Sequence, residues 1–203
     1  MARYTGPRVR VLRALGTDLP GLTRKTPNNR TQPPGQHGGK QQRKSEFGQQ
    51  LIEKQKLRYH YGVSEVQLRT LMKEAKKGKN PTGEKLIELL ERRLDNVVFR
   101  AGFAPSIPCA RQLVRHGHIQ VNGRRVTMPA QRVRPGDVLS LGSKAEKVPA
   151  VVESLAEPAL ARPEWIAFDG TQKRATLAHV PPGDAQPFPL EMQKVVEYYA
   201  TRG

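Results

Sequence analysis

The pair Asn122-Gly123 constrains the fold of this 203-residue chain more than any other feature. A two-residue type I′ turn needs positive φ at both central residues, and Asn-Gly adopts it readily, so the pair predicts a β-hairpin. The four residues before the turn alternate polar and apolar side chains, and the three residues after it form the returning strand. A Pro-Gly-Asp turn at 135–137 then precedes a third predicted strand at 138–141.

Two short helices are predicted directly before this hairpin. Apolar residues recur at helical spacing from Leu94 to Ala101, and Gly102 ends the first helix. Ser106 offers an N-cap for the second helix, and Gly117 provides a left-handed cap at its end. The stretch therefore predicts a helix pair packed on a small sheet.

Arginines and amides cluster on the second helix and on the hairpin. These side chains donate hydrogen bonds to phosphate oxygens, so the pattern indicates a surface that binds an anion. The alternative interpretation is that the arginines beside the turn only keep it hydrated. The residues that we expect to contact the anion are Arg111, Gln112, Arg115, His116, His118, Asn122, Gly123, Arg124 and Arg125.

The net charge of +17 at pH 7 is concentrated in the first two-thirds of the chain. Residues 1–60 carry 13 Lys and Arg against 3 Asp and Glu, residues 61–141 carry 15 against 7, and residues 142–203 carry 7 against 8. A polyanion is therefore expected to meet the first two-thirds. No long apolar run indicates a membrane span or a secretory signal, so nucleic acid is favoured over a membrane surface.

The N-terminal region predicts a basic arm with little regular structure. A short helix is expected at 8–15, between a proline and a glycine. Residues 23–43 are rich in Pro, Gly, Asn and Gln and show no apolar face. We therefore expect an irregular arm there that becomes ordered by what it binds.

Helices are predicted after the arm. Ser45 caps a helix that should reach about residue 61, and a capping box at 64–67 begins the next one. A further helix is expected at 82–93. The basic run at 76–79 is either a solvated loop or a phosphate contact, and the sequence leaves both open.

The last third of the chain predicts short elements. Segments 146–152 and 165–168 resemble strands, and 173–180 is a candidate for a last strand. Residues 190–200 predict a short amphipathic helix.

The sequence offers little chemistry beyond binding. It contains five His and a single Cys, Cys109, which excludes an intramolecular disulfide. It shows no catalytic motif and no set of metal ligands at suitable spacing, so we expect no catalytic residue, no metal and no cofactor. Asp95 is interpreted as a helix residue that pairs with Arg92 or Arg93.

Aromatic residues make up only 5% of the chain and do not interleave with the basic runs. Proteins that bind RNA by base stacking present aromatic rings to the bases, so this pattern instead favours recognition of backbone phosphates and helix shape. Structured RNA, in which phosphates gather at helix junctions, is the predicted partner.

Two motifs in this stretch closely resemble the RNA-binding domain of the ribosomal protein S-four family: RRLDNVVFRAGFA at 92–104 and ARQLVRHGHIQVNG at 110–123. This domain also occurs in RNA-modifying enzymes, so the flanking motifs decide. The sequence resembles the ribosomal protein itself at MARYTGP, PGQHG, FGQQLIEKQKLR and YGV before residue 64, and at PLE and VVEYY after residue 188. The resemblance spans nearly the whole chain.

The resemblance implies an α+β fold with four parts. Residues 1–44 form the basic arm and residues 45–91 a helical domain. Residues 92–184 form the inserted RNA-binding domain, with two helices on a small sheet. Residues 185–203 include a C-terminal helix that returns to the helical domain. Many relatives hold zinc through cysteines in the arm, but this chain has no Cys before Cys109.

The resemblance also implies a function and its partners. The chain is expected to bind small-subunit (16S-type) ribosomal RNA, to nucleate assembly of the subunit body and to contribute to translational accuracy. Expected neighbours are ribosomal proteins S-five and S-twelve, and mRNA where it enters the ribosome. The expected location is the small ribosomal subunit in the cytoplasm, with an organellar ribosome left open. The RNA-binding residues expected in the N-terminal half are Arg3, Tyr4, Arg8, Arg10, Arg13, Arg43, Lys44, Lys54, Lys56 and Arg58.

Two other functions compete with this interpretation. An RNA-modifying enzyme with the same RNA-binding domain would need a further catalytic domain, and no segment has a suitable pattern. An RNA chaperone that handles stalled ribosomes would not need the N-terminal half typical of the ribosomal protein.

Overall fold

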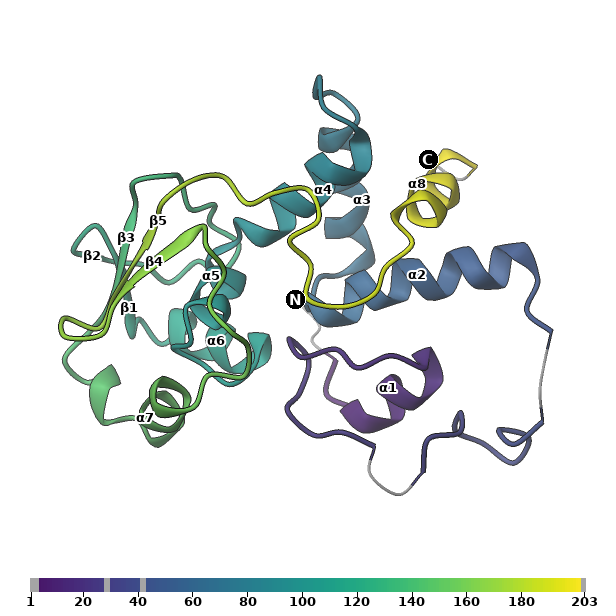
Figure 1. Cartoon of the computed structure of the whole chain (residues 1–203), viewed down its shortest axis with the longest axis horizontal. Coiled ribbons are helices and arrows are strands. Elements are labelled where there is room, and N and C mark those ends of the chain that lie inside the picture. Colours follow the sequence, from purple (N-terminus) through teal and green to yellow (C-terminus); the bar gives the residue numbers. More distant parts are fainter. Residues whose placement is uncertain (1–3, 28–29, 41–42, 202–203) are drawn as a thin grey trace. The chain divides into compact units, whose positions relative to one another are not determined.

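The computed structural model describes residues 4–27, 30–40 and 43–201 (Figure 1). Within these residues the chain forms eight α-helices, one 3-10 helix and one five-stranded sheet, which confirms the predicted α+β class. It divides into two compact units: residues 1–87 together with 186–203, and residues 88–185. We call them the N-terminal unit and the sheet unit. Helix α4 (Thr82–Glu91) contains the boundary between them.

Capping residues explain why the helices of the N-terminal unit begin where they do. The Ser45 hydroxyl accepts a hydrogen bond from the Gly48 N–H at 3.2 Å, and Ser64 and Gln67 form the predicted capping box. Helix α1 lies between Pro7 and a left-handed Gly16, as predicted. The helices are α1 (Arg8–Leu15), α2 (Glu46–His60), α3 (Glu65–Ala75), α4 (Thr82–Glu91) and α8 (Met192–Ala200).

The C-terminal helix α8 packs on α2, which confirms the predicted return of the chain to the helical part (Figure 1). Buried polar contacts hold the helices together. Lys54 Nζ lies 2.8 Å from Glu65 Oε2, and the Tyr199 hydroxyl donates to Glu65 Oε1 at 2.8 Å. Lys56 Nζ lies 2.7 Å from Glu53 Oε1, and Glu53 also accepts from the backbone of the segment that enters α8.

Two pKa shifts reflect this packing. Burial by itself raises the pKa of Glu65, but hydrogen bonds from Lys54 and Tyr199 outweigh it and hold this pKa below its ordinary value. Burial and the neighbouring Glu65 carboxylate raise the pKa of the Tyr199 hydroxyl far above its ordinary value. Tyr199 therefore remains a neutral donor to a charged carboxylate, which favours this pairing at neutral pH.

The sheet unit contains an antiparallel sheet of order β2-β1-β3-β5-β4. Its inward residues, among them Ile119, Leu139 and Leu177, are buried, whereas the alternate residues are partly or fully exposed. One face is therefore core and the other is open to solvent. The elements are α5 (Leu94–Arg100), α6 (Ile107–Arg115), β1 (Ile119–Val121), β2 (Arg124–Arg125), β3 (Val138–Leu141), the 3-10 helix η1 (Ala145–Lys147), α7 (Pro149–Ala156), β4 (Ile166–Asp169) and β5 (Arg174–Leu177).

Segment 146–152 was predicted as a strand, and that prediction is wrong. The structure has η1 there, followed by α7. Pro149 stands at the first turn of α7, where a missing N–H costs nothing, and the apolar residues after it are buried on one side only. A short apolar run with β-branched residues does not distinguish a strand from a helix.

Smaller differences concern element ends and one cap. The strand predicted at 124–126 comprises only β2, and the strand predicted at 173–180 comprises only β5. The helix predicted at 82–93 ends at Glu91. Ser106 is the N-cap residue of α6, as predicted, although its side chain makes no capping hydrogen bond. The strand predicted at 138–141 has the predicted limits.

A buried carboxylate joins the two helices that lead into the hairpin. Asp95 is completely buried and accepts from Arg93 at both oxygens, with Nε at 3.1 Å and Nη2 at 2.9 Å. It also accepts from Arg111 of α6, with Nη2 at 2.7 Å. The predicted pairing with Arg93 is confirmed. A buried charge is tolerated only when it is paired and hydrogen-bonded, and Asp95 satisfies both conditions.

Removal of this charge should destabilise the sheet unit. In an Asp95→Asn variant two arginines lose their shared carboxylate, so unfolding should become easier by about 3 kcal/mol. Urea unfolding followed by the fluorescence of Trp165, the one tryptophan of the chain and a buried residue of this unit, measures the loss. The exposed Asp184→Asn should stay within about 0.5 kcal/mol of the unmodified protein. A similar result for Asp95→Asn would contradict the role of this network.

Candidate nucleic-acid interface

Helix α6 passes into strand β1 through a tight glycine turn. Gly117 has φ of 71°, its N–H donates to Val114 O at 2.9 Å, and the His118 N–H donates to Leu113 O at 3.0 Å. These two bonds form a Schellman cap, in which a left-handed residue closes the helix. The predicted left-handed cap is confirmed. The end of α6 and the start of the hairpin are therefore held in one fixed arrangement.

The hairpin turn has the predicted conformation, with φ of 51° at Asn122 and 76° at Gly123. The Asn122 side chain also anchors the turn to the start of β3. Its Nδ2 donates to Asp137 Oδ1 at 2.8 Å, and its Oδ1 accepts from the Val138 N–H at 2.9 Å. Asp137 in turn accepts from the Arg134 N–H at 2.7 Å. The amide of Asn122 thus serves the rigidity of the turn.

Arg125 lies back over the glycine turn. Its Nη2 donates to the carbonyl oxygen of His116 at 3.1 Å, and a Cβ added at Gly117 would collide with its guanidinium. Gly117 is therefore required both for its positive φ and for this close approach. In the same region, the ring centroids of His116 and His118 lie 6.1 Å apart.

Two other cations at this end of the sheet unit are exposed. Arg115 closes α6, and Arg124 begins β2 beside the turn. In the described part of the chain neither arginine has an ion-pair partner. Gln112 is exposed on the same helix. An unpaired arginine on a rigid element can meet a phosphate without first breaking an internal contact.

Other predicted contact residues already form ion pairs inside the protein. Arg111 is ion-paired with the buried Asp95, and only 15% of its side chain is exposed. Lys54 and Lys56 are buried in the N-terminal unit, where each has a glutamate partner. The charges of these three residues are largely neutralised within the fold.

The N-terminal unit presents a second set of basic residues. Arg10 is exposed on α1, Arg8 donates to Leu22 O at 3.4 Å, and Arg13 donates to Gln32 O at 2.9 Å. Within 23–43, the described residues form neither helix nor strand. The remaining predicted residues are Tyr4, Arg43 and Lys44, which are exposed, Arg58, which is half-buried, and Arg3, which lies outside the described residues.

Several exposed cations are not among the contact residues predicted from the sequence. Arg69 and Lys73 are exposed on α3 at i, i+4 spacing, on the face opposite the buried Leu68 and Met72. Arg134 is exposed beside the Pro-Gly-Asp turn. The signal for the first pair was present in the helical periodicity, which shows which face of α3 points to solvent.

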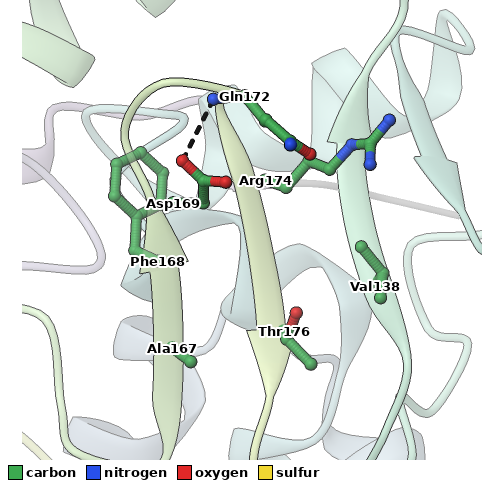
Figure 2. Close-up of a pocket in the computed structure, with 7 residues that line it drawn as sticks. All are labelled: Val138, Ala167, Phe168, Asp169, Gln172, Arg174 and Thr176. Atoms are coloured by element: carbon green, nitrogen blue, oxygen red, sulfur yellow. Dashed lines mark hydrogen bonds between the residues drawn. The ribbon is translucent and has the colours of Figure 1, made fainter.

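A shallow pocket of about 370 Å³ lies on the open face of the sheet. Figure 2 shows Arg174 reaching away from Asp169, its cross-strand neighbour. Asp169 Oδ1 instead accepts from the N–H groups of Thr171 and Gln172, which fixes the turn between β4 and β5. The pocket therefore holds one carboxylate that is already used in a turn. It contains no paired acid and base for catalysis.

Two other features are absent from the described residues. No group of three or more His, Cys, Asp or Glu there is arranged to hold a metal ion. No helix in that part of the chain has the length and apolar character needed to cross a membrane. The clearest chemical feature is the set of exposed cations.

Known proteins match the chain over its full length. Residues 3–91 match the family model described as Ribosomal protein S4/S9 N-terminal domain, and residues 92–139 match the S4 domain. The chain is 60% identical to the small ribosomal subunit protein uS4 of Methylobacillus flagellatus, with 100% of both chains aligned. This chain belongs to the uS4 family. Relatives named uS4B in Nitrosomonas europaea and uS4 in a Synechococcus species share 53% and 46% identity, again over 100% of both chains.

Membership in the uS4 family confirms the resemblance stated from the sequence motifs. The uS4 family is a family of ribosomal proteins and not a family of enzymes. The S4 domain match covers α5, α6 and the hairpin, where Arg115, Arg124 and Arg125 are exposed. The second family match covers the basic arm and the helices of the N-terminal unit.

The fit between Gly117 and Arg125 can be tested by comparing two glycines. Gly136 also has positive φ, but a Cβ there would meet no atom within 4 Å. Gly136→Ala should cost about 1–2 kcal/mol from backbone strain alone. Gly117→Ala should cost about 1 kcal/mol more, because the added methyl group also displaces Arg125. Urea unfolding followed by Trp165 fluorescence compares the two. Equal losses would show that Arg125 does not rest against Gly117.

Proposed function

We propose that this protein is a non-enzymatic constituent of the small ribosomal subunit that binds small-subunit ribosomal RNA directly. The main supporting observation is the pair of exposed arginines, Arg115 and Arg124, on a rigid helix–hairpin element of an S4 domain. Phosphate contacts provide much of the affinity of proteins for nucleic acids, and exposed cations without an internal partner are available to make them.

The hairpin and the basic arm act as two contact regions on one RNA. The hairpin is held by the Schellman cap at Gly117 and by the Asn122–Asp137 contact, so it offers fixed geometry to a folded RNA. The arm contributes charge, since residues 1–60 carry a net charge of +10. A rigid clamp combined with a charged arm suits a helical junction, where phosphates from several strands meet. RNA binding of this kind early in assembly would nucleate the subunit body.

Protein neighbours belong to the same proposal. Phe47 is 41% exposed and stacks on Tyr198, with ring centroids 5.9 Å apart, beside a hollow of about 410 Å³. Glu46 lies in the same hollow, so this surface suits a protein better than an RNA. We assign it to a neighbouring ribosomal protein, with S-five and S-twelve as the expected partners.

We also propose where the protein works and how it contributes to accurate decoding. The protein works in the small ribosomal subunit of the cytoplasm. Contacts with neighbouring proteins, and with mRNA where it enters the ribosome, are its proposed routes to translational accuracy. The arm, with Arg43 and Lys44 exposed, supplies the cations for mRNA.

The two competing functions receive no support from a specific observation. An RNA-modifying enzyme needs a catalytic domain, but the whole of this chain aligns with relatives that are named as ribosomal proteins. A free RNA chaperone does not account for the match of residues 3–91 to a ribosomal N-terminal domain.

The salt dependence of binding tests the hairpin surface. Arg115→Gln combined with Arg124→Gln should weaken binding to small-subunit ribosomal RNA and flatten the slope of log K against log salt by about 1.5, because two phosphate contacts are lost. Filter binding at several salt concentrations measures this slope.

The matched control removes two positive charges elsewhere in the sheet unit. Lys144 and Lys147 are exposed and lie in the part of the chain with a net charge of −1. Their double change to Gln should leave the slope nearly unaltered. If both double variants flattened the slope equally, the hairpin would attract RNA only through general charge. That result would contradict a specific binding surface on the hairpin.

A further inference from the structure

An exposed tyrosine stands on the N-terminal unit without the cover that aromatic rings usually have. Tyr4 is 43% exposed, and its ring meets the ring of Tyr59 at 81°, with the centroids 5.2 Å apart. In a perpendicular contact of this kind Tyr59 can cover at most one face of the Tyr4 ring, and the exposed fraction shows that part of the ring meets solvent. The Tyr4 hydroxyl donates to Pro7 O at 3.3 Å, which fixes the ring orientation.

The backbone is shaped to hold the ring in this position. A Cβ added at Gly6 would lie 2.7 Å from the hydroxyl oxygen of Tyr4 and 2.8 Å from its Cζ. Glycine therefore allows the ring to fold back against its own chain. Gly6, Pro7 and Tyr59 hold the Tyr4 ring in one orientation. Binding a ligand to the exposed ring therefore costs little further side-chain entropy.

The part of the chain that carries Tyr4 and Tyr59 is basic. The guanidinium of Arg58 lies 5.6 Å from the centroid of Tyr59, and Arg10 is exposed on α1 with no ion-pair partner among the described residues. The first 60 residues carry a net charge of +10. An open aromatic face in a basic region suits a ligand that is flat and negatively charged, and a nucleotide has both properties.

We propose that Tyr4 is a stacking site for one unpaired nucleobase of the bound RNA, with Arg58, which lies over the adjacent Tyr59 ring, next to its phosphate. This inference rests on the proposed ribosomal RNA binding and adds how one part of that RNA is held. It also revises the expectation that the chain reads only phosphates and helix shape. The sequence suggested no stacking surface, because Tyr4 and Tyr59 are far apart in the chain and only folding brings them together.

The test uses the full-length protein and transcribed small-subunit ribosomal RNA. Tyr4→Leu removes the aromatic face and should weaken binding about 10-fold at every salt concentration, with the salt slope unchanged. Tyr4→Phe keeps the ring and loses only the hydroxyl, so its affinity should stay within about 3-fold of the unmodified protein. Arg10→Gln should instead flatten the slope by about 0.7–0.9.

A matched control and a footprint complete the experiment. Val66→Ala removes an apolar side chain of the same unit that is 75% exposed, and it should leave RNA affinity unchanged. Chemical probing of the RNA with Tyr4→Leu should expose one unpaired nucleotide, while the rest of the protected region stays protected.

Each contrary outcome is informative. Unchanged affinity of Tyr4→Leu overturns the stacking site, and so does an equal loss for Tyr4→Phe. A loss that appears only when neighbouring ribosomal proteins are present assigns the ring to a protein partner and also overturns it. If the unmodified protein fails to bind ribosomal RNA, the proposed function itself fails, which is a separate result.

Discussion

The sheet unit depends on the Asp95 carboxylate and the two arginines that share it. Asp95 is completely buried, and its oxygens accept from Arg93 beside it and from Arg111 on the next helix. The network therefore sets how α6 lies against α5. The far end of α6 carries Arg115 and the Gly117 cap, so this buried charge also determines where the exposed arginines of the hairpin stand. A single unpaired member would leave a charge in the core without compensation.

The fold divides the cations of the chain into two groups with different roles. Lys54, Lys56 and Arg111 have carboxylate partners and little exposure, so they stabilise packing. Arg115 and Arg124 are exposed on rigid elements, so they are available to a ligand. The net charge of +17 describes attraction to a polyanion, but it does not say which charges touch the ligand. On the N-terminal unit, Tyr4 adds an exposed aromatic ring, which the net charge could never indicate.

Local signals predicted much of the fold. Ser45, the capping box from Ser64 to Gln67, the Gly117 cap and the Asn-Gly turn all act within a few residues, so their geometry follows from short-range sterics and hydrogen bonds. The error at 146–152 arose where an apolar run fits strand and helix equally and its surroundings decide. The predicted contact residues came from charge and resemblance, and these criteria do not separate a buried lysine from an exposed one.

The sequence by itself determined the turns, the helix limits near good caps, the distribution of charge and the family. These properties depend on single residues or on close neighbours in the chain. Tertiary structure alone decided that Arg111, 16 residues from Asp95, is an internal partner. It also brought the ring of Tyr4 to Tyr59. The physical reason is the same in both cases, because burial and pairing depend on groups that meet only after the chain has folded.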